Sequence, residues 1–375
     1  MPNVLSVYDP LFYAQEALIQ LEKNLGLAGR VYRGYDKSPQ QKGSTISIRR
    51  PSTFTALAAP QTAQSINASE VQITLDQWYE VKFALTDKEV TYTTEQIVAE
   101  HIRPAAYAIA DKIDQQLAAL YKFIPWSNTN SSPLAVADIT ANRRILNTNN
   151  APTDMRHLML SPTQEEEALN LSAFAQHQGA GDAGVQTQMR GTLGMKYGYE
   201  VFMNQNTQTH TTGVSADATG ALTAAGTRGD TAISFDSVTS GGTFKAGDSF
   251  IIAGNAQRYV FTADFTATGG AKTDAPIFPA LVQDYDNLAV VTITLLSGEQ
   301  GLGFHRNAFA LAMAPLSEMG DGRGAQIATV TDPITGLSLR SRIFYVGDTS
   351  TNYVSIDALW GVKTLDANLA CRLVN

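Results

Sequence analysis

The side chains that most often carry out chemistry in proteins are few and scattered in this chain. Its 375 residues include five histidines and one cysteine, Cys371. The histidines are far apart and form no His-x-x-x-His pair, so the ligand spacing typical of a zinc site is missing from the sequence. His305 lies beside Arg306 and is better interpreted as a core or interface residue than as a general base. No metal site and no catalytic histidine or cysteine is predicted.

Glycine-rich and acidic segments do not supply a site either. Residues 269–273 (Gly-Gly-Ala-Lys-Thr) resemble a phosphate-binding loop, but Ala271 separates the glycine from the lysine and no helix is expected to follow. Residues 165–167 are three glutamates that suit the first turn of a helix. Gly-Asp pairs such as 247–248 lack the alternating oxygen ligands of a calcium loop, and 320–324 is interpreted as a mobile loop. We therefore expect no catalytic residue and no cofactor, which favours a structural role.

Composition limits the possible partners. Charged residues make up 17% of the chain, against about 25% in average proteins, so we expect part of the surface to be buried in an assembly. An enzyme with a weakly charged surface is the alternative at this point. The net charge of −8 argues against a basic face that grips nucleic acid.

The sequence also indicates where the protein is made. A single cysteine excludes an intramolecular disulfide framework and fits a reducing cytoplasm. No signal peptide is recognised at the N-terminus, and no run of about 18 apolar residues predicts a membrane span. We expect synthesis and assembly in the cytoplasm.

The most regular pattern in the chain lies at residues 71–85. Apolar residues fill the odd positions except Gln77, and polar residues fill most of the even ones, which is the period of a strand with one buried face. Strands usually stop within about 10 residues, and this run would reach about 50 Å at roughly 3.3 Å per residue. A strand of this length suggests a part that contacts something beyond its own core.

The segments before this run predict a hairpin. Residues 10–25 form an expected amphipathic helix with an apolar stripe from Leu11 to Leu25, and 31–33 and 44–50 are expected strands. Residues 51–70 are small and polar and suit a flexible tip. Two strands joined by such a tip would make a projecting arm. The alternative is an ordinary surface loop between two strands of a sheet.

The remaining chain predicts an α+β fold with an insertion. A helix of about 27 residues begins near Thr93 with a capping-box spacing to Gln96, and Pro104 should kink it. Residues 127–132 are expected to be a loop, and 193–203 a single closing segment. Short β runs within 206–299, separated by glycine-rich turns, predict a small β-barrel or sandwich. The other expected elements are helices at 137–147 and 162–171, a strand at 156–160, an apolar segment of ambiguous type at 304–316, and strands at 337–346 and 353–374.

Several segments together resemble a known family. They are 71–78 (VQITLDQW), 81–89 (VKFALTDKE), 104–106 (PAA), 110–114 (ADKID), 304–311 (FHRNAFAL) and 336–340 (GLSLR). They are similar to tailed-bacteriophage major capsid (coat) proteins, and most similar to the P-twenty-two type. The resemblance covers the chain outside the insert and is most specific from the long strand to the long helix.

The resemblance implies a Hong Kong ninety-seven-like major capsid fold with an inserted small β-barrel domain. Its parts map as follows: N-terminal arm 1–40; extended hairpin loop 41–75; peripheral domain 76–126 and 337–375, with the spine helix at 94–122; axial domain 127–205 and 300–336; inserted β-barrel 206–299.

The function implied is self-assembly into the icosahedral shell of a tailed phage. The shell would be built from pentamers and hexamers, mature from a procapsid, and enclose double-stranded DNA without sequence-specific binding. Scaffolding and portal proteins are the implied partners, and the virion capsid, assembled in the host bacterial cytoplasm, is the implied location. An encapsulin-like or gene-transfer-agent shell of the same fold is the first alternative, and an enzyme with a β insert is the second.

Four charged residues are the predicted inter-subunit contacts, because they lie on the expected arm: Arg49, Arg50, Asp76 and Glu80. Exposed ion pairs contribute only about 0–1 kcal/mol. A solvated face is therefore the alternative interpretation of the same residues.

Overall fold

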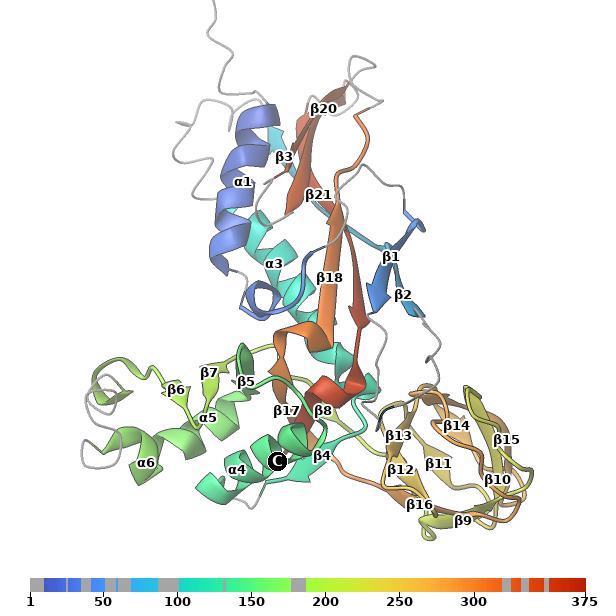
Figure 1. The fold of residues 1–375 in the computed structure, drawn as a ribbon. Helices are drawn as coiled ribbons and strands as arrows, with labels where there is room; N and C mark the ends of the chain where they lie inside the picture. Colours follow the sequence, from blue (N-terminus) through green and yellow to red (C-terminus); the bar gives the residue numbers. More distant parts are fainter. Residues whose placement is uncertain are drawn as a thin grey trace, which may run out of the picture. The chain divides into compact units, whose positions relative to one another are not determined.

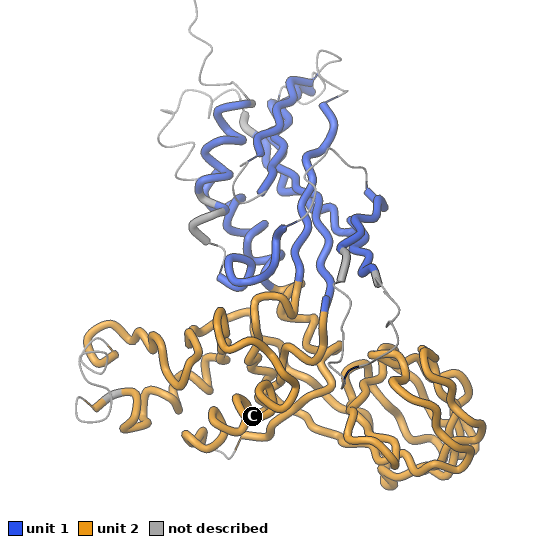
Figure 2. Tube along the Cα trace, in the orientation of Figure 1, with its two compact units in different colours: residues 1–114, 310–365 blue, residues 115–309, 366–375 orange. Residues whose placement is uncertain are grey.

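The chain divides into two compact units in the computed structural model (Figure 2). Unit 1 contains residues 1–114 and 310–365, and unit 2 contains residues 115–309 and 366–375. The described residues are 10–24, 26–34, 42–50, 59, 69–86, 101–130, 133–176, 187–318, 325–331, 337–346 and 351–375.

The described residues of unit 1 form helices α1 and α3, a β-sheet and a separate β-ribbon (Figure 1). The sheet has the strand order β18-β21-β20-β19, and β3 also pairs with β21; β1 and β2 form the ribbon. The elements are α1 (Pro10–Asn24), η2 (Ala28–Arg30), β1 (Thr45–Arg50), β2 (Ser69–Thr74), β3 (Gln77–Thr86), α3 (Arg103–Ala118), β18 (Phe309–Ala314), β19 (Ala325–Thr331), β20 (Ser338–Val346) and β21 (Thr351–Thr364).

Helix α1 matches the amphipathic helix predicted for residues 10–25. It begins at Pro10, which suits a first helical position, and packs against β19 and β20. Its buried side chains are Tyr13, Ala14, Ala17, Leu18 and Leu21. Leu11, expected on this stripe, is 43% exposed, so the buried face is centred on Ala14 and Leu18 instead. Leu25 lies outside the described residues.

Helix α3 is the described part of the predicted long helix. Residues 101–102 form a π-helical turn directly before it, as expected where Pro104 removes a backbone donor from the helix. The predicted start at Thr93 lies outside the described residues. At the other end, buried Asp114 accepts hydrogen bonds from the backbone N–H groups of Gly26 (2.9 Å), Leu27 (3.1 Å) and Ala28 (3.1 Å). This carboxylate ties α3 to the segment that follows α1.

The run at residues 71–85 is two strands, not one. It divides at Leu75–Asp76: β2 pairs with β1, and β3 pairs with β21. On β2 the predicted alternation is present, with Ile73 and Leu75 buried and the even positions exposed. On β3 the even positions are exposed too, but the odd positions are only half-buried, and Tyr79 is exposed. The alternation by itself does not mark the change of pairing partner, whereas the family resemblance separates the extended loop from the peripheral domain after residue 75. Residues 31–33 also form less than a strand, with only an isolated bridge from Tyr32 to Ala310 among the described residues.

Unit 2 contains a mixed sheet with the order β4-β22-β17-β5-β7-β6, and β8 also pairs with β17. Two elements differ from prediction: the expected loop at 127–132 contains β4, which pairs in parallel with β22, and 193–203 is the hairpin β6–β7. The elements are η5 (Ala119–Phe123), β4 (Ser127–Thr129), α4 (Val136–Thr148), β5 (Arg156–Leu160), α5 (Pro162–Leu169), α6 (Ser172–Ala175), β6 (Gly194–Lys196), β7 (Tyr199–Met203), β8 (Thr209–His210), β17 (Gly298–His305), η6 (Arg306–Ala308), η8 (Ala367–Leu369) and β22 (Ala370–Val374).

Helix α5 shows why these residues form a helix. Ser161 Oγ accepts a hydrogen bond from the Gln164 backbone N–H (3.1 Å), and Gln164 Oε1 accepts one from the Ser161 N–H (3.2 Å). This reciprocal capping box, with Pro162 at the first helical position, satisfies donors that the helix itself leaves unpaired.

The insert is a closed barrel, as predicted, with strand order β10-β15-β13-β12-β16-β9. Its core is rich in stacked aromatic rings, such as Phe250 and Phe261 with centroids 4.5 Å apart. Gly269 and Gly270 form the turn that leads into β15, so the segment resembling a phosphate loop is a β-hairpin turn. The strands are β9 (Thr219–Leu222), β10 (Ala232–Asp236), β11 (Thr243–Phe244), β12 (Ser249–Ile252), β13 (Arg258–Phe261), β14 (Phe265–Thr266), β15 (Lys272–Phe278) and β16 (Val290–Thr294).

Both units are discontinuous in the chain. In its C-terminal part, β18, β19, β20 and β21 belong to the sheet of unit 1, whereas β22 pairs with β17 and β4 in unit 2. The family resemblance likewise divides the peripheral and axial domains into separate segments, and its domain boundaries stay a prediction.

Candidate functional site: the β1–β2 ribbon and the sheet below it

The β1–β2 ribbon is the described part of the predicted arm. The strands are antiparallel, with Ile46 opposite Ile73, Ile48 opposite Val71 and Arg50 opposite Ser69. Because side chains alternate along a strand, the two apolar pairs lie on one face of the ribbon. Their burial decreases along that face: Ile46 and Ile73 are buried, whereas Ile48 and Val71 are only half-buried. The described residues of unit 1 thus cover the base of the ribbon and leave the next pair partly open.

The base of the ribbon is held by a small hydrophobic cluster. Ile46, Ile73 and Leu75 pack with Leu359 of β21 and with alternate residues of β18, namely Ala310, Ala312 and Ala314. The small alanine side chains let the ribbon approach the sheet closely. Gly361 of β21 also permits this close approach, since a Cβ at this position would overlap the carbonyl oxygen of Thr74 in β2.

We expect Gly361→Ala to weaken this anchor. The added methyl group would force β2 away from β21, and overpacking of this kind typically costs about 1–3 kcal/mol. Urea unfolding of unassembled subunits measures the effect. Gly29→Ala is the matched control, because a Cβ there meets nothing within 4 Å. Equal unfolding midpoints for the two variants would contradict a close fit at Gly361.

A buried charge cluster lies in the sheet below the ribbon. Asp357 of β21 is fully buried and accepts hydrogen bonds from Arg340 Nε (3.0 Å) and Nη2 (2.6 Å) and from Trp78 Nε1 (3.0 Å). Arg342 Nη2 lies 3.4 Å from the same carboxylate and 3.0 Å from Glu80 Oε2. The two-point contact with Arg340 is the strong, geometrically specific form of a charge-assisted hydrogen bond. The whole cluster joins β3, β20 and β21.

The structure places the four predicted contact residues on β1, on β3 and at the joint between β2 and β3. Arg49 and Arg50 lie on β1, opposite Glu70 and Ser69, and their side chains are outside the described part of the structure. Asp76 is exposed at the joint between β2 and β3. Glu80 is on β3 and pairs with Arg342 of its own chain.

Asp357, Arg340 and Trp78 are not among the contact residues predicted from the sequence. The signal that could have found Asp357 is a single carboxylate in the otherwise uncharged and mostly apolar run 354–360 (VSIDALW), because buried charges require partners. Its partners could not be found in this way, since Trp78 and Arg340 come from distant segments.

The described histidines have structural partners. His157 Nδ1 lies 2.9 Å from Glu200 Oε2, His101 stacks on Phe83, and burial lowers the pKa of His305. His177 lies outside the described residues. Burial raises the pKa of Cys371 to about 12, which makes its thiol a poor nucleophile at neutral pH.

No cluster of metal-ligating side chains occurs among the described residues, and no described helix is long and apolar enough to cross a membrane.

A second buried pair joins the barrel to the mixed sheet within unit 2. His210 Nε2 of β8 lies 2.9 Å from Asp248 Oδ1, and Tyr121 Oη lies 3.1 Å from His210 Nδ1. Asp248 Oδ2 accepts from the backbone N–H groups of Lys245 (2.8 Å) and Gly213 (3.1 Å). Burial alone would raise the pKa of Asp248, but the hydrogen bonds from His210 and from the backbone outweigh it and lower the pKa.

We expect this junction to lose stability in acid. Because the pKa of Asp248 is lower in the folded state, its stabilisation is fully present above the ordinary aspartate pKa of about 4 and is lost as the pH falls through the folded-state value. Urea unfolding at pH 7, 4 and 3 checks this. Asp248→Asn should have a lower urea unfolding midpoint than wild type at pH 7, and its midpoint should fall less between pH 7 and pH 3. The exposed control Asp286→Asn should match wild type, and a parallel decline in all three proteins would contradict the assignment.

Comparison with known proteins identifies the fold. No protein-family model and no curated protein sequence matches the chain. A solved structure from Mycobacterium phage Che8 matches 93% of this chain and 90% of its own, with a TM-score of 0.51 and 14% identity. The capsid structure of Cyanophage P-SCSP1u has a TM-score of 0.45 and 11% identity, covering 92% of this chain and 89% of its own. A virus-like particle from Pyrococcus furiosus has a TM-score of 0.43 and 9% identity, covering 96% of each chain.

The likeness to the Che8 structure extends over nearly the whole length of both chains. The fold is therefore the α+β, Hong Kong ninety-seven-like capsid fold, with a closed β-barrel inserted in unit 2. The expectation of fold from the sequence resemblance is confirmed. At 14% identity the likeness identifies an architecture.

Proposed function

We propose that this chain is the major capsid protein of a tailed bacteriophage, which self-assembles into the icosahedral shell around the phage genome. Besides the fold, one observation carries the proposal: the apolar face of the β1–β2 ribbon, buried at Ile46 and Ile73, becomes half-exposed at Ile48 and Val71. A ribbon held by its own unit at the base, with an apolar face that continues beyond it, is suited to lie on a neighbouring subunit.

The mechanism is assembly and not turnover. Each subunit would place its arm on a neighbour, and the same contact would repeat around closed rings of five and six subunits. Individually modest contacts then sum over the shell. Neither a catalytic residue nor a cofactor is assigned, because the described histidines and Cys371 are engaged or buried in structural positions.

The charge of the chain suits the enclosure of DNA without tight binding. With a net charge of −8 the subunit lacks the overall basic character that drives non-specific binding to the phosphate backbone. The enclosed double-stranded DNA would then not be read by sequence and could be released. Scaffolding and portal proteins are the proposed partners, and assembly would take place in the host bacterial cytoplasm.

Expression of the chain with and without its neighbouring genes tests the proposal. Negative-stain microscopy should show closed, uniform particles, and nuclease-protected nucleic acid in particles from infected cells would distinguish a phage capsid from a protein-filled compartment. Soluble monomers under all conditions, or shells that enclose only a cargo protein, would contradict it.

A further inference from the structure

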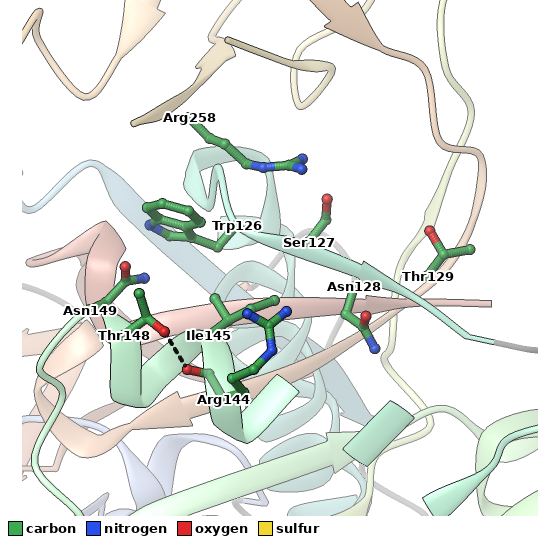
Figure 3. Close-up of a pocket in the computed structure, with 9 residues that line it drawn as sticks. All are labelled: Trp126, Ser127, Asn128, Thr129, Arg144, Ile145, Thr148, Asn149 and Arg258. Carbon is green, nitrogen blue, oxygen red and sulfur yellow. Dashed lines mark hydrogen bonds between the residues drawn. The ribbon is translucent and has the colours of Figure 1, made fainter. Parts of the chain in front are cut away.

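A pocket of about 460 Å³ lies in unit 2 beside the C-terminal half of α4 (Figure 3). Its wall includes Trp126, Ser127 and Asn128 at the start of β4, Arg144 and Asn149 from the end of α4, and Arg258 at the start of β13. Its volume is within the range of pockets that hold small molecules, about 300–1,000 Å³. Nothing in the proposed shell function uses this pocket.

The pocket carries two positive charges that the described residues do not neutralise. In Figure 3 the side chains of Arg144 and Arg258 lie on opposite sides of it, with Trp126 and Ser127 between them. No carboxylate is among the lining residues, and neither arginine forms an ion pair within the described part of the chain.

Two neutral groups add further hydrogen-bonding capacity. Ser127 Oγ and Asn149 Nδ2 are buried and have no hydrogen-bond partner among the described residues. Buried donors of this kind are rare in folded proteins and call for a partner. Both belong to residues that line the pocket, so a rotation of either side chain would let an acceptor bound there pair with it.

The rest of the wall is fixed in place. Trp126 Nε1 donates to Asn368 Oδ1 (2.9 Å), and Asn128 Nδ2 donates to the carbonyl oxygen of Asp138 (3.1 Å). These bonds orient the tryptophan ring and the β4 segment before any ligand arrives, which reduces the entropy lost on binding.

The negative end of the α4 dipole would oppose an anion if its carbonyl groups were free. They are already hydrogen-bonded: Thr148 Oγ1 donates to the carbonyl of Arg144 (2.9 Å), and the N–H groups of Asn149 and Ala151 donate to those of Ile145 and Leu146 (3.0 Å each). These hydrogen bonds weaken the opposition, and with two arginines and no carboxylate in its lining the pocket is positively charged.

We propose that this pocket binds a phosphate group, either of a free nucleotide or of a nucleic-acid strand. Two guanidinium groups match the charge of about −1.5 to −2 and the three acceptor oxygens of a phosphate monoester such as a nucleotide. They also match the charge of two phosphodiester groups of a strand, which carry one negative charge each. A single carboxylate needs only one arginine for its two oxygens. Trp126 provides an aromatic ring beside the charged groups, as sites for nucleotides commonly do.

Binding to the purified full-length protein tests this, by titration calorimetry with inorganic phosphate, adenosine monophosphate, a duplex DNA and polyglutamate. Phosphate or the nucleotide should bind wild type, and Arg144→Gln and Arg258→Gln should each weaken that binding about tenfold or more. Arg228→Gln, an exposed barrel arginine away from the pocket, should leave it unchanged. Thermal unfolding of each variant confirms that it is folded.

The comparison among ligands identifies the source of the phosphate. Binding of adenosine monophosphate without binding of duplex DNA indicates a free nucleotide. Binding of duplex DNA that is lost in both Arg144→Gln and Arg258→Gln indicates a nucleic-acid strand. Either result supports the proposal. The proposal would be overturned if wild type bound none of the three phosphate ligands. It would also be overturned if Arg228→Gln lost as much affinity as Arg144→Gln and Arg258→Gln. Binding of polyglutamate that phosphate does not displace would also overturn it and assign the pocket to an acidic protein. Shell formation by these variants is a separate measurement, so failure here leaves the proposed function untouched.

Discussion

Replacing residues 51–68 with an Asn-Gly turn is expected to leave a folded subunit that forms no shells. Arg50 and Ser69 lie directly opposite each other, so a two-residue turn of this type can join β1 to β2. The base of the ribbon keeps its contacts with β18 and β21, and the urea unfolding midpoint should stay close to wild type. The part of the arm beyond Arg50 and Ser69 would be lost, and with it the reach to a neighbour.

Sedimentation and negative-stain microscopy of the purified variant measure the effect. A second variant keeps the length of 51–68 but replaces its residues with Gly and Ser. If this variant also fails to assemble, the side chains of the segment are required; if it assembles, its length is what matters. Normal shells from the shortened variant would show that the arm does not hold the shell together.

Asp357→Ala is expected to destabilise unit 1 severely. Removing the carboxylate leaves Arg340, whose side chain is 10% exposed, without its partner, and it deprives Trp78 Nε1 of an acceptor. Breaking a buried ion pair in this way costs about 3–5 kcal/mol. Urea unfolding monitored by tryptophan fluorescence should report this loss, and hydrogen exchange should locate it in β20 and β21.

Glu80→Gln is the matched control for this cluster. Glu80 pairs with Arg342 at the surface, with its side chain 37% exposed, so solvent screening limits its contribution to about 0–1 kcal/mol. Asp357→Asn keeps an acceptor for Trp78 and should fall between the two. Equal effects of Asp357→Ala and Glu80→Gln would mean that the buried carboxylate does not hold the sheet together.

The long alternating run shows how far the sequence could be read. The period of two gave the buried face correctly on β2, where Ile73 and Leu75 are buried, because that face is set locally by the pleat of the chain. On β3 the expected buried face is only half-buried, and Tyr79 on it is exposed. The alternation stays in phase through Leu75 and Asp76, where the pairing partner changes from β1 to β21. Nothing in the local pattern marks that change, since it depends on which distant strand is nearby.

The same limit applies elsewhere in the chain. Strand β5 and the barrel were predicted because their own residues specify them, by an apolar run and by short strands between glycine turns. The placement of β22 in unit 2 was not, because its partners β4 and β17 are remote in sequence. The Asp357 cluster and the pocket lined by Arg144 and Arg258 were not predicted from the sequence for the same reason. Each joins segments that only the folded chain brings together.

A three-dimensional reconstruction of the assembled particle by electron cryomicroscopy tests most directly whether the β1–β2 ribbon joins neighbouring subunits. We expect a closed icosahedral shell in which β1 and β2 lie on an adjacent subunit, with Ile48 and Val71 covered there. A particle in which this ribbon contacts only its own subunit, or a protein that forms no closed shell, would contradict it.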